Sequence, residues 1–405
     1  MKLASLKSGS GASPGKLRDR SETPDAHDRS ATADAAPARA PKSPPAGASH
    51  LPVWKRSAPI APRNAWYVAA FLHEVGRDPM ERWILGEPVA LYRTRDGRPV
   101  ALDGRCPHHY FPLGKSPVRD DNVVCGYHGM TFAPDGTAVD MPTIGKPPAA
   151  CNIHSYPVEE RWQLLWIWPG DPAKADPALI PDLGDWRIDD PEFGVKPLFY
   201  REIPARYQLL HDNLLDLSHL EFLHAGTIGT PGISGTREER WVEGNRLTTR
   251  RLVENIPVPE RLSSRVHGHD GRIDREFSLT FLCPSVYAGS EEFRDAETGR
   301  SFGSAIFFHV ITPARADAMH YFFVRGRNFA LPQAEEAAAI ALLERTIRED
   351  VEAAVEVERM MSMSVNLPDE VLLSSDKTLH LGRRMLADMI RAEQAEDTGT
   401  SKVTP

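Results

Sequence analysis

Two of the four cysteines in this chain are each followed closely by a histidine, as Cys106-x-His108 and Cys125-x-x-His128. Thiolates and imidazoles are metal ligands, and two of each can bind one zinc ion or a 2Fe–2S cluster with both histidines on one iron. Zinc fingers usually group the two cysteines together and the two histidines together, whereas here each cysteine has its own histidine. The pattern therefore favours an iron–sulfur cluster clamped between two loops, with zinc as the alternative.

Glycines beside the second pair suit a cluster that the main chain approaches closely. Gly126 and Gly129 lack side chains, so their backbone can come near the cluster and donate hydrogen bonds to sulfur. His109 also follows Cys106, but the Cys-x-His spacing favours His108 as the ligand. We therefore expect one cysteine and one histidine from each loop.

A second group of metal-ligand residues lies in the apolar segment 207–226. His219 and His224 have H-x4-H spacing, and Asp216 precedes the first of them by three positions. A lone histidine in such a segment is usually a satisfied core residue, but burying two histidines and an aspartate costs several kcal/mol unless partners satisfy them. Two histidines and a carboxylate on one face are the usual ligands of an O2-activating Fe(II) site.

The spacing of these histidines conflicts with a regular helix. Segment 207–226 has the length and apolar density of a helix ending at Gly226, yet residues five apart point roughly 140° from each other. We therefore predict a loosened or ending turn around Glu221–His224. Asp216, one turn before His219, could accept the second ring N–H and fix its tautomer.

The third ligand is predicted on a long helix at 333–361. Asp350 lies within an apolar stripe at helical spacing, and a carboxylate aimed into a core requires a cation. Glu349 and Glu352 project toward a face shared with arginines, which we interpret as solvated. The stripe comprises Leu343, Ile347, Val351, Ala354 and Val355.

Composition changes along the chain indicate two folded domains after a tail. We expect a disordered extension at 1–58, a small all-β domain at 59–170, a Pro- and Asp-rich connector at 171–195, an α+β domain at 196–396 and a flexible tail at 397–405. Residues 1–50 contain no Val, Ile, Phe, Trp or Tyr and no apolar run typical of a secretory signal.

Local signals place the metal motifs within this plan. Asp96-Gly97, Asp103-Gly104 and Asp135-Gly136 predict hairpins in the all-β domain, so the cysteine–histidine pairs fall on its loops. In the second domain, the segment 207–226 is followed by a run of apolar strands and then by two helices, at 333–361 and 381–395. We therefore predict an antiparallel sheet with helices laid against it.

Overall composition excludes several classes of protein. A formal charge of −8 argues against a nucleic-acid-binding surface over the whole molecule, and no apolar run approaches the length of a membrane span. Four cysteines do not make a disulfide scaffold, and their pairing with histidine indicates metal binding in a reducing, cytoplasmic compartment. Cys151 and Cys283 have no partner at ligand spacing and are interpreted as small buried residues.

These motifs resemble a known family. C-x-H…C-x-x-H with "GYHG" resembles the Rieske 2Fe–2S signature, and "NAWYVAAFLHEV" and "YPVEERWQLLWIWPGD" resemble the Rieske domain of bacterial ring-hydroxylating oxygenases, especially the vanillate O-demethylase-like branch. "NLLDLSH" followed by "FLHAGTIG" resembles that branch's mononuclear-iron motif, and "ED" at 349–350 resembles its carboxylate ligand; Asp369 and Asp376 are weaker rivals. The resemblance implies a helix-grip, START-like catalytic domain.

The resemblance also implies an activity. Electrons from NAD(P)H would pass through a reductase to the Rieske cluster and then to Fe(II) held by His219, His224 and Asp350. The chain would be the terminal oxygenase of a monooxygenase that O-demethylates a methoxylated, vanillate-like aromatic acid to a phenol and formaldehyde. The alternative is a ring-hydroxylating mono- or dioxygenase acting on a phthalate- or phenoxybenzoate-like acid, with the same metal ligands.

Partners follow from the resemblance and from one absence. The sequence shows no Rossmann glycine fingerprint, so the reductase must be another, flavin- or ferredoxin-type protein. In the family the matching aspartate bridges neighbouring subunits of a trimer, so Asp216 would connect His219 to His128 or His108 of another protomer. Asn213, in the same motif, either lines the active site or packs the helix.

Two further questions stay open at this level. Arg251, Arg265 and His309 could each pair with a substrate carboxylate, although such residues are more often solvated charge. An electron carrier would need only the first domain, and a ligand-binding module would leave Asp350 buried without a cation. An electron carrier and a ligand-binding module therefore each account for fewer of the metal-binding motifs than an oxygenase does.

Overall fold

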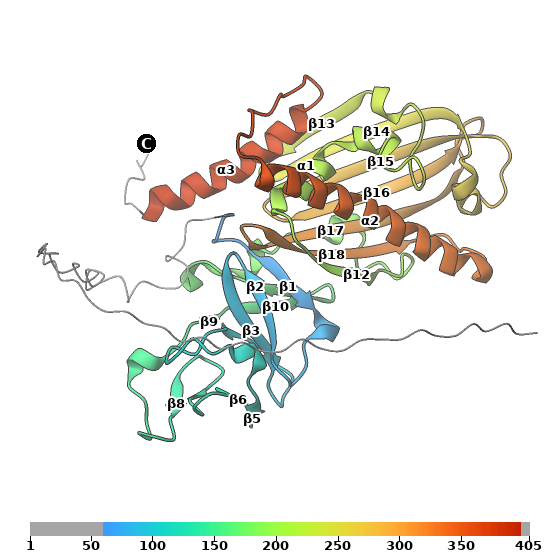
Figure 1. Cartoon of the computed structure of the whole chain (residues 1–405). Helices are drawn as coiled ribbons and strands as arrows, with labels where there is room; N and C mark the ends of the chain where they lie inside the picture. Colours follow the sequence, from blue (N-terminus) through green and yellow to red (C-terminus); the bar gives the residue numbers. More distant parts are fainter. Residues whose placement is uncertain (1–59, 398–405) are drawn as a thin grey trace, which may run out of the picture. The chain divides into compact units, whose positions relative to one another are not determined.

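The computed structural model describes residues 60–397, all of which belong to one compact unit. Its N-terminal part, the β domain, contains three small antiparallel sheets with strand orders β1-β11-β10, β2-β3-β4-β9 and β5-β6-β7-β8 (Figure 1). The strands are β1 (Tyr67–Phe71), β2 (Met80–Ile84), β3 (Glu87–Arg93), β4 (Pro99–Asp103), β5 (Val118–Arg119), β6 (Asn122–Val124), β7 (Thr131–Phe132), β8 (Ala138–Asp140), β9 (Ser155–Tyr156), β10 (Val158–Arg161) and β11 (Leu164–Ile167).

Strand β3 is apolar on both faces because it separates two cores. Val89 and Leu91 enter the main core, which continues into the rest of the molecule, while Ala90 and Tyr92 enter a smaller one. Successive side chains of a strand point to opposite faces, so alternate residues supply different cores. The smaller core lies under the two cysteine–histidine loops.

The C-terminal part, the helix–sheet domain, is built on a seven-stranded antiparallel sheet with order β12-β18-β17-β16-β15-β14-β13. Helix α2 runs across one face of this sheet (Figure 1). The strands are β12 (Lys196–Ile203), β13 (Glu238–Glu243), β14 (Arg246–Pro257), β15 (Arg272–Leu282), β16 (Val286–Asp295), β17 (Ser301–Arg315) and β18 (Ala318–Arg327), and the helices are α1 (Tyr207–Leu215), α2 (Gln333–Met363) and α3 (Lys377–Asp397). The predicted α+β class is confirmed.

The β domain and the sheet share hydrogen bonds as well as a core. The turn between β2 and β3 donates from Leu85 N to Pro313 O at 2.8 Å and from Gly86 N to Ala314 O at 2.7 Å. His320 Nε2 on β18 lies 2.8 Å from the carbonyl oxygen of Trp83. These contacts fix β2 against the end of β17 and β18.

Most of the expected turns and helices form as predicted. Asp96-Gly97 connects β3 to β4 and Asp135-Gly136 connects β7 to β8, whereas the hairpin expected at Asp103-Gly104 is wrong. A Cβ on Gly104 would lie 2.9 Å from the carbonyl carbon of Pro88, so this glycine permits a close crossing instead of a turn. The two C-terminal helices form; α2 ends two residues later than predicted, and α3 begins four residues earlier and ends two residues later.

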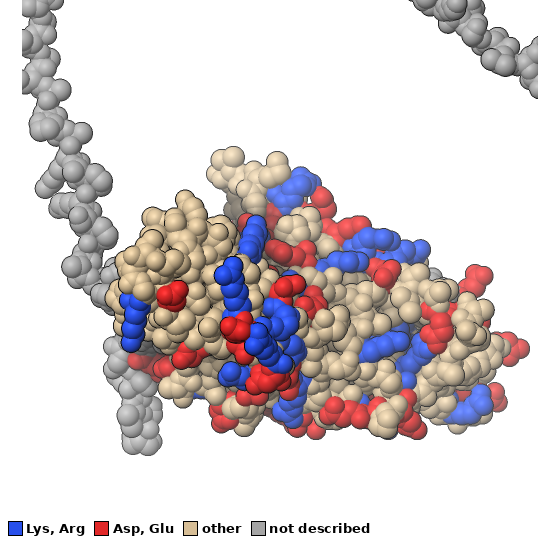
Figure 2. Space-filling model, turned by 90° about the horizontal axis from the view of Figure 1, so that it is seen from below, with Lys and Arg blue, Asp and Glu red and all other residues tan. Residues whose placement is uncertain are grey.

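Charge and hydropathy agree with the exclusions drawn from composition. Figure 2 shows acidic and basic side chains interspersed over the face that it displays, without a large basic region for nucleic acid. Among the described helices, none is long and apolar enough to cross a membrane. The expectations for 1–58 and for most of 397–405 fall outside the described residues.

Candidate active site

Helix α1 holds the first part of the site, and ion pairs fix it to both neighbouring helices. At its start, Arg206 Nε lies 2.7 Å from Glu358 Oε2 and Arg206 Nη2 lies 2.8 Å from Glu358 Oε1, which joins α1 to α2. One turn from its end, Asp212 Oδ2 lies 2.6 Å from Arg383 Nη2 of α3. Bidentate guanidinium–carboxylate pairs fix orientation as well as distance.

The helix predicted over 207–226 ends much earlier, at Leu215. Asp216 leaves helical geometry, and its carboxylate accepts a hydrogen bond from Ser218 N at 2.9 Å, which caps a short 3-10 turn, Leu217–Glu221. The chain then turns again before His224. The irregularity that the H-x4-H spacing requires is therefore present, but it begins at Asp216, five residues before the predicted segment.

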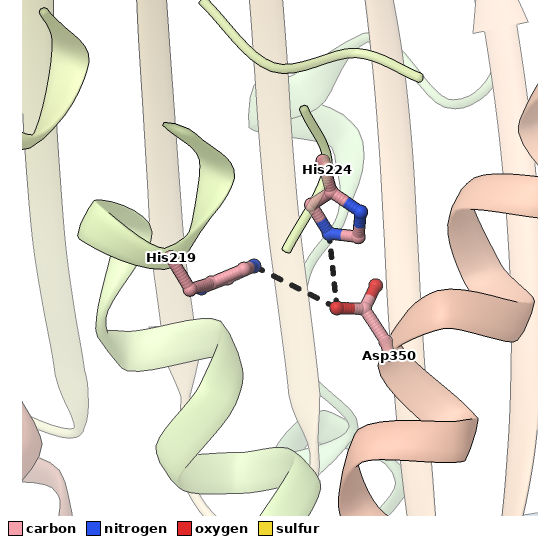
Figure 3. A group of neighbouring side chains, drawn as sticks. All are labelled: His219, His224 and Asp350. Carbon is pink, nitrogen blue, oxygen red and sulfur yellow. Dashed lines mark hydrogen bonds and ion pairs between the residues drawn. The ribbon is translucent and has the colours of Figure 1, made fainter. Parts of the chain in front are cut away.

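Three side chains converge after this break. His224 Nε2 lies 3.0 Å from Asp350 Oδ1 and His219 Nε2 lies 3.6 Å from the same oxygen. One ligand atom from each residue falls within 4.8 Å of the others. Figure 3 shows the two rings reaching Asp350 of α2 from separate turns. The structure thus assembles the two histidines and the carboxylate, and their role as iron ligands is taken up below.

The partners of the two rings select the tautomer that a metal needs. His224 Nδ1 lies 2.8 Å from Glu349 Oε2, and His219 Nδ1 contacts the backbone carbonyl oxygen of Asp216. Because these oxygens only accept, each Nδ1 carries the proton, and each Nε2 lone pair faces Asp350. Two lone pairs directed at a buried carboxylate are mutually repulsive unless a proton on one ring or a metal cation lies among them. The donor set therefore fits Fe(II).

Ionisation in the group follows burial and proximity. Burial lowers the pKa of His219. Burial also lowers the pKa of His224, but Asp350 and Glu349 outweigh this effect and raise it overall. Burial would raise the pKa of Asp350, yet hydrogen bonding to His224 and the adjacent histidine charges lower it. The carboxylate is therefore ionised in a site that is almost closed to water.

Two expectations about nearby acids are wrong. The carboxylate of Asp216 does not reach the His219 ring; its backbone carbonyl does, while the carboxylate serves as a cap. Glu349 does not simply face solvent, because its longer side chain bends to His224 while also lying 3.6 Å from Arg345. Thr227 Oγ1 donates to Glu349 Oε2 at 2.6 Å and holds it there.

The remaining predicted residues separate clearly. Asn213 Nδ2 donates to Asp350 Oδ1 at 3.1 Å, so it belongs to the site. Asp369 is exposed, and Asp376 accepts from Leu373 N at a turn. Sequence analysis missed Glu349 and Thr227 as site residues. Their only signals were the adjacent acid at 349–350 and a hydroxyl three residues after His224.

The cysteine–histidine loops have matching backbone geometry. Tyr110 N donates to Cys106 O at 2.8 Å, and Gly129 N donates to Cys125 O at 2.9 Å. Both closing residues have positive φ, 58° at Tyr110 and 78° at Gly129. Gly126 N donates to Ser116 Oγ at 3.2 Å, so both glycine N–H groups bond to oxygen here, and their donation to cluster sulfur stays a prediction. Two equivalent loops nevertheless present one cysteine and one histidine each.

The four expected cluster ligands are arranged asymmetrically. Cys106 and Cys125 are buried free thiols, whereas the rings of His108 and His128 are exposed with centroids 4.8 Å apart. His109 also lies close, its centroid 4.0 Å from that of His108. Buried sulfur and exposed imidazole suit a 2Fe–2S cluster whose histidine-bound iron lies toward the surface.

A cavity of about 380 Å³ adjoins the triad. Its walls are largely apolar and its histidines and carboxylate lie among them, which is typical of a small-molecule site. The aromatic part of the wall comprises Phe277, Phe307, Phe323 and Phe329. Of the three residues considered for substrate binding, Arg265 and His309 line this cavity, while Arg251 is buried elsewhere and pairs with Glu238.

Comparison with known proteins gives the same two parts. Residues 65–157 match the Rieske [2Fe-2S] domain, and residues 203–392 match the vanillate O-demethylase oxygenase C-terminal domain. The toluene-4-sulfonate monooxygenase system iron-sulfur subunit of Comamonas testosteroni is 35% identical over 344 residues, 82% of this chain and 97% of that protein. The vanillate O-demethylase oxygenase subunit of a Pseudomonas species is 36% identical over 68% of this chain and 79% of its own length.

Solved structures extend the likeness to the fold. Dicamba monooxygenase bound to 3,6-dichlorosalicylic acid superimposes with a TM-score of 0.75 at 30% sequence identity, covering 82% of this chain and 98% of that one. The likeness therefore includes both the β domain and the helix–sheet domain.

Proposed function

Because this chain belongs to the Rieske non-haem iron oxygenases with a vanillate O-demethylase type of catalytic domain, we propose that it removes the methyl group of a methoxylated aromatic acid. The chain is an oxygenase component, like the relatives named as an oxygenase subunit or component, and a separate reductase would supply its electrons. The observation that carries the proposal is the triad His219, His224 and Asp350 at the wall of an apolar cavity.

In the proposed assignment, His219, His224 and Asp350 hold Fe(II), and Cys106, His108, Cys125 and His128 hold the cluster. When bound, the iron activates O2 and the cluster supplies electrons to it. The overall change is one O2, two electrons, two protons and one aryl methyl ether giving a phenol, formaldehyde and water. Hydroxylation of the methyl carbon gives a hemiacetal, which breaks at its C–O bond.

The protein's own groups prepare this reaction. Glu349 and the Asp216 carbonyl keep both Nδ1 atoms protonated, and Asn213 holds Asp350 Oδ1 by donating to it. The aromatic walls exclude water and hold the ring of the substrate beside the triad.

We also propose the electron path and the assembly. Asp216 caps the turn that carries His219, and its carboxylate does not touch that ring. It is therefore available to a histidine of a neighbouring cluster domain, His128 or His108, whose rings are exposed. The corresponding proposal is that electrons pass between protomers of a homotrimer. A separate NAD(P)H-dependent reductase in the cytoplasm would supply these electrons.

A single-turnover assay tests the reaction. The enzyme is loaded with both iron centres, reduced without air, mixed with one methoxylated aromatic acid at a time and exposed to O2. We expect formaldehyde and the matching phenol. Ring-hydroxylated product without formaldehyde would contradict demethylation and favour a phthalate- or phenoxybenzoate-type hydroxylase instead.

A further inference from the structure

One cation on the wall of the cavity has no partner among the described residues. Arg325 on β18 lines the cavity, yet its guanidinium makes no hydrogen bond or ion pair within this part of the chain. Its partial exposure is to the cavity. An arginine in such a place retains five N–H donors aimed at whatever enters.

Two of the three acids at this end of the cavity, Glu291 and Glu336, already pair with arginines, and the third, Glu335, also lines the cavity. Glu291 accepts from Arg265 and from Arg275, and Arg327 pairs with Glu336. Glu291 attracts Arg325 through its charge but makes no direct ion pair with it, because both of its oxygens accept from Arg265 and Arg275. The Nε and Nη2 atoms of Arg265 are likewise buried without an acceptor. This end of the cavity has more positive than negative charge.

The cost of this arrangement shows in the ionisation of Arg325. Burial, together with the charge of Arg265, lowers the pKa of Arg325 to about 10. Removing a cation from water is unfavourable unless an anion accompanies it. A ligand with a negative group would offset that cost.

The register of the sheet places Arg325 at a useful distance from the triad. His309 pairs with Phe323, and Phe307 pairs with Arg325, one row further along. His309 lines the same cavity as Asp350 and His219, and it is close enough for their charges to act on it, so its row is the one beside the triad. Alternate residues share a face, and two residues span about 7 Å. That is close to the length of a substituted benzene ring.

We propose that Arg325 is the specificity residue of this oxygenase, and that it binds the carboxylate or sulfonate of an aromatic substrate whose opposite substituent lies at the triad. This inference rests on the proposed function. The apolar wall between the two ends, which includes Phe307 and Phe323, would hold the ring. A carboxylate and a sulfonate offer the same oxyanion chemistry to a guanidinium.

Binding without turnover tests the proposal separately from the reaction. Calorimetric titrations of the oxidised, iron-loaded enzyme would use 4-methoxybenzoate, 4-methoxybenzenesulfonate and the uncharged 4-methoxybenzamide. We expect wild type to prefer at least one anion to the amide. Arg325→Gln should weaken that anion about tenfold or more and leave the amide unchanged, because a charged hydrogen bond is lost. Arg325→Lys should restore part of the preference.

Arg315→Gln is the matched control, since Arg315 at the end of β17 pairs with Glu202 and is not among the residues that line the cavity. It should change the anion affinity little. Arg325→Gln should also keep or raise the melting temperature, because it removes an unpaired buried cation. The proposal is overturned if wild type shows no preference for either anion, or if Arg325→Gln weakens amide and anion equally.

The two proposals fail in different ways. An anion preference that depends on Arg325, without formaldehyde from any methoxylated acid, would sustain the anion site and remove the demethylation. Formaldehyde released equally well from acid and amide, regardless of Arg325, would sustain the reaction and remove the anion site. The benzoate and benzenesulfonate arms show which oxyanion the site prefers.

Discussion

Both histidines of the triad have their Nδ1 atoms held by oxygen acceptors that lie outside the triad. His224 uses the side chain of Glu349, whereas His219 uses the main chain of Asp216. A side-chain acceptor can be removed by substitution, but a backbone carbonyl cannot. The two rings therefore offer different opportunities to test how the site is held together.

Glu349→Ala removes the acceptor of His224 without touching a proposed ligand. The ring would lose its fixed tautomer and orientation, and loss of such a partner typically costs 10- to 100-fold in metal affinity. Competitive chelation should show this weaker binding of the mononuclear iron, while the visible absorption of the cluster persists. Glu352→Ala on the exposed side of α2 is the control. Iron retention equal in both variants would argue against the role of Glu349.

At the scale of single residues, the sequence predicts which residues belong to the site better than it predicts which atoms they contact. Asp350 could be selected because a carboxylate in an apolar stripe needs a cation. Glu349 could not be selected, because adjacent helical positions point about 100° apart. Its carboxylate reaches His224 only because the glutamate side chain is one methylene longer than that of aspartate. Arg325 could not be selected either, because the sequence does not show which acids near it pair with other arginines.

The short turn after α1 and the strand β18 are the elements that place the chemistry. Predicting one helix over 207–226 was reasonable from apolar density, but Asp216 competes by capping a new turn at Ser218. The D-L-S sequence in the middle of the apolar run is a capping signal, whereas our prediction gave the Asp216 carboxylate a hydrogen bond to the His219 ring instead. The position of β18 depends on contacts far apart in sequence, which no local signal reports.

His320 on β18 connects that strand to β2. Its Nε2 donates to Trp83 O, and its Nδ1 lies 3.1 Å from Tyr200 Oη, so the neutral ring is fully satisfied. Burial, together with the charge of Arg82, lowers the pKa of His320 to about 4. Below its ordinary pKa of about 6.5 the unfolded chain takes up a proton that the folded protein refuses. Stability is therefore lost as pH falls from about 6.5 toward 4.

His320→Gln should reduce that loss. Between pH 6.5 and 5, wild type should lose about 2 kcal/mol more free energy of unfolding than the variant does. Denaturant titrations at the two pH values measure the difference. His73→Gln, at an exposed histidine of the β domain, is the control and should keep the wild-type dependence. Identical pH dependence in wild type and His320→Gln would contradict the assignment.

In the molecule as a whole, the β domain and the helix–sheet domain share one continuous core. Residues of β1, β3 and β11 share that core with the sheet and with α1 and α2. The sequence indicated two domains and their classes from composition and motifs. The sequence could not indicate this shared packing. Apolar residues of β3 give the same sequence pattern whether they pack against another sheet or under loops.

Asp216→Asn tests the proposed transfer between protomers. Asparagine caps a turn as well as aspartate does, so the fold and both metal centres should remain. Loss of the charge should instead slow reoxidation of the reduced cluster by O2 and substrate, measured by stopped-flow absorption. A mixture of a cluster-deficient variant, Cys106→Ala, with an iron-site variant, His219→Ala, should recover activity in shared oligomers. Unchanged reoxidation and no recovery would together exclude the path.

The most direct test of the account compares one-turnover formaldehyde yields of wild type, Asp350→Ala and Asp369→Ala, together with their iron content. Asp350 is buried in the triad, while Asp369 is the exposed rival on the loop after α2. We predict that Asp350→Ala loses the mononuclear iron and the formaldehyde while its cluster absorption persists, and that Asp369→Ala behaves as wild type. Formaldehyde from Asp350→Ala at the wild-type yield would contradict the assignment of the active site.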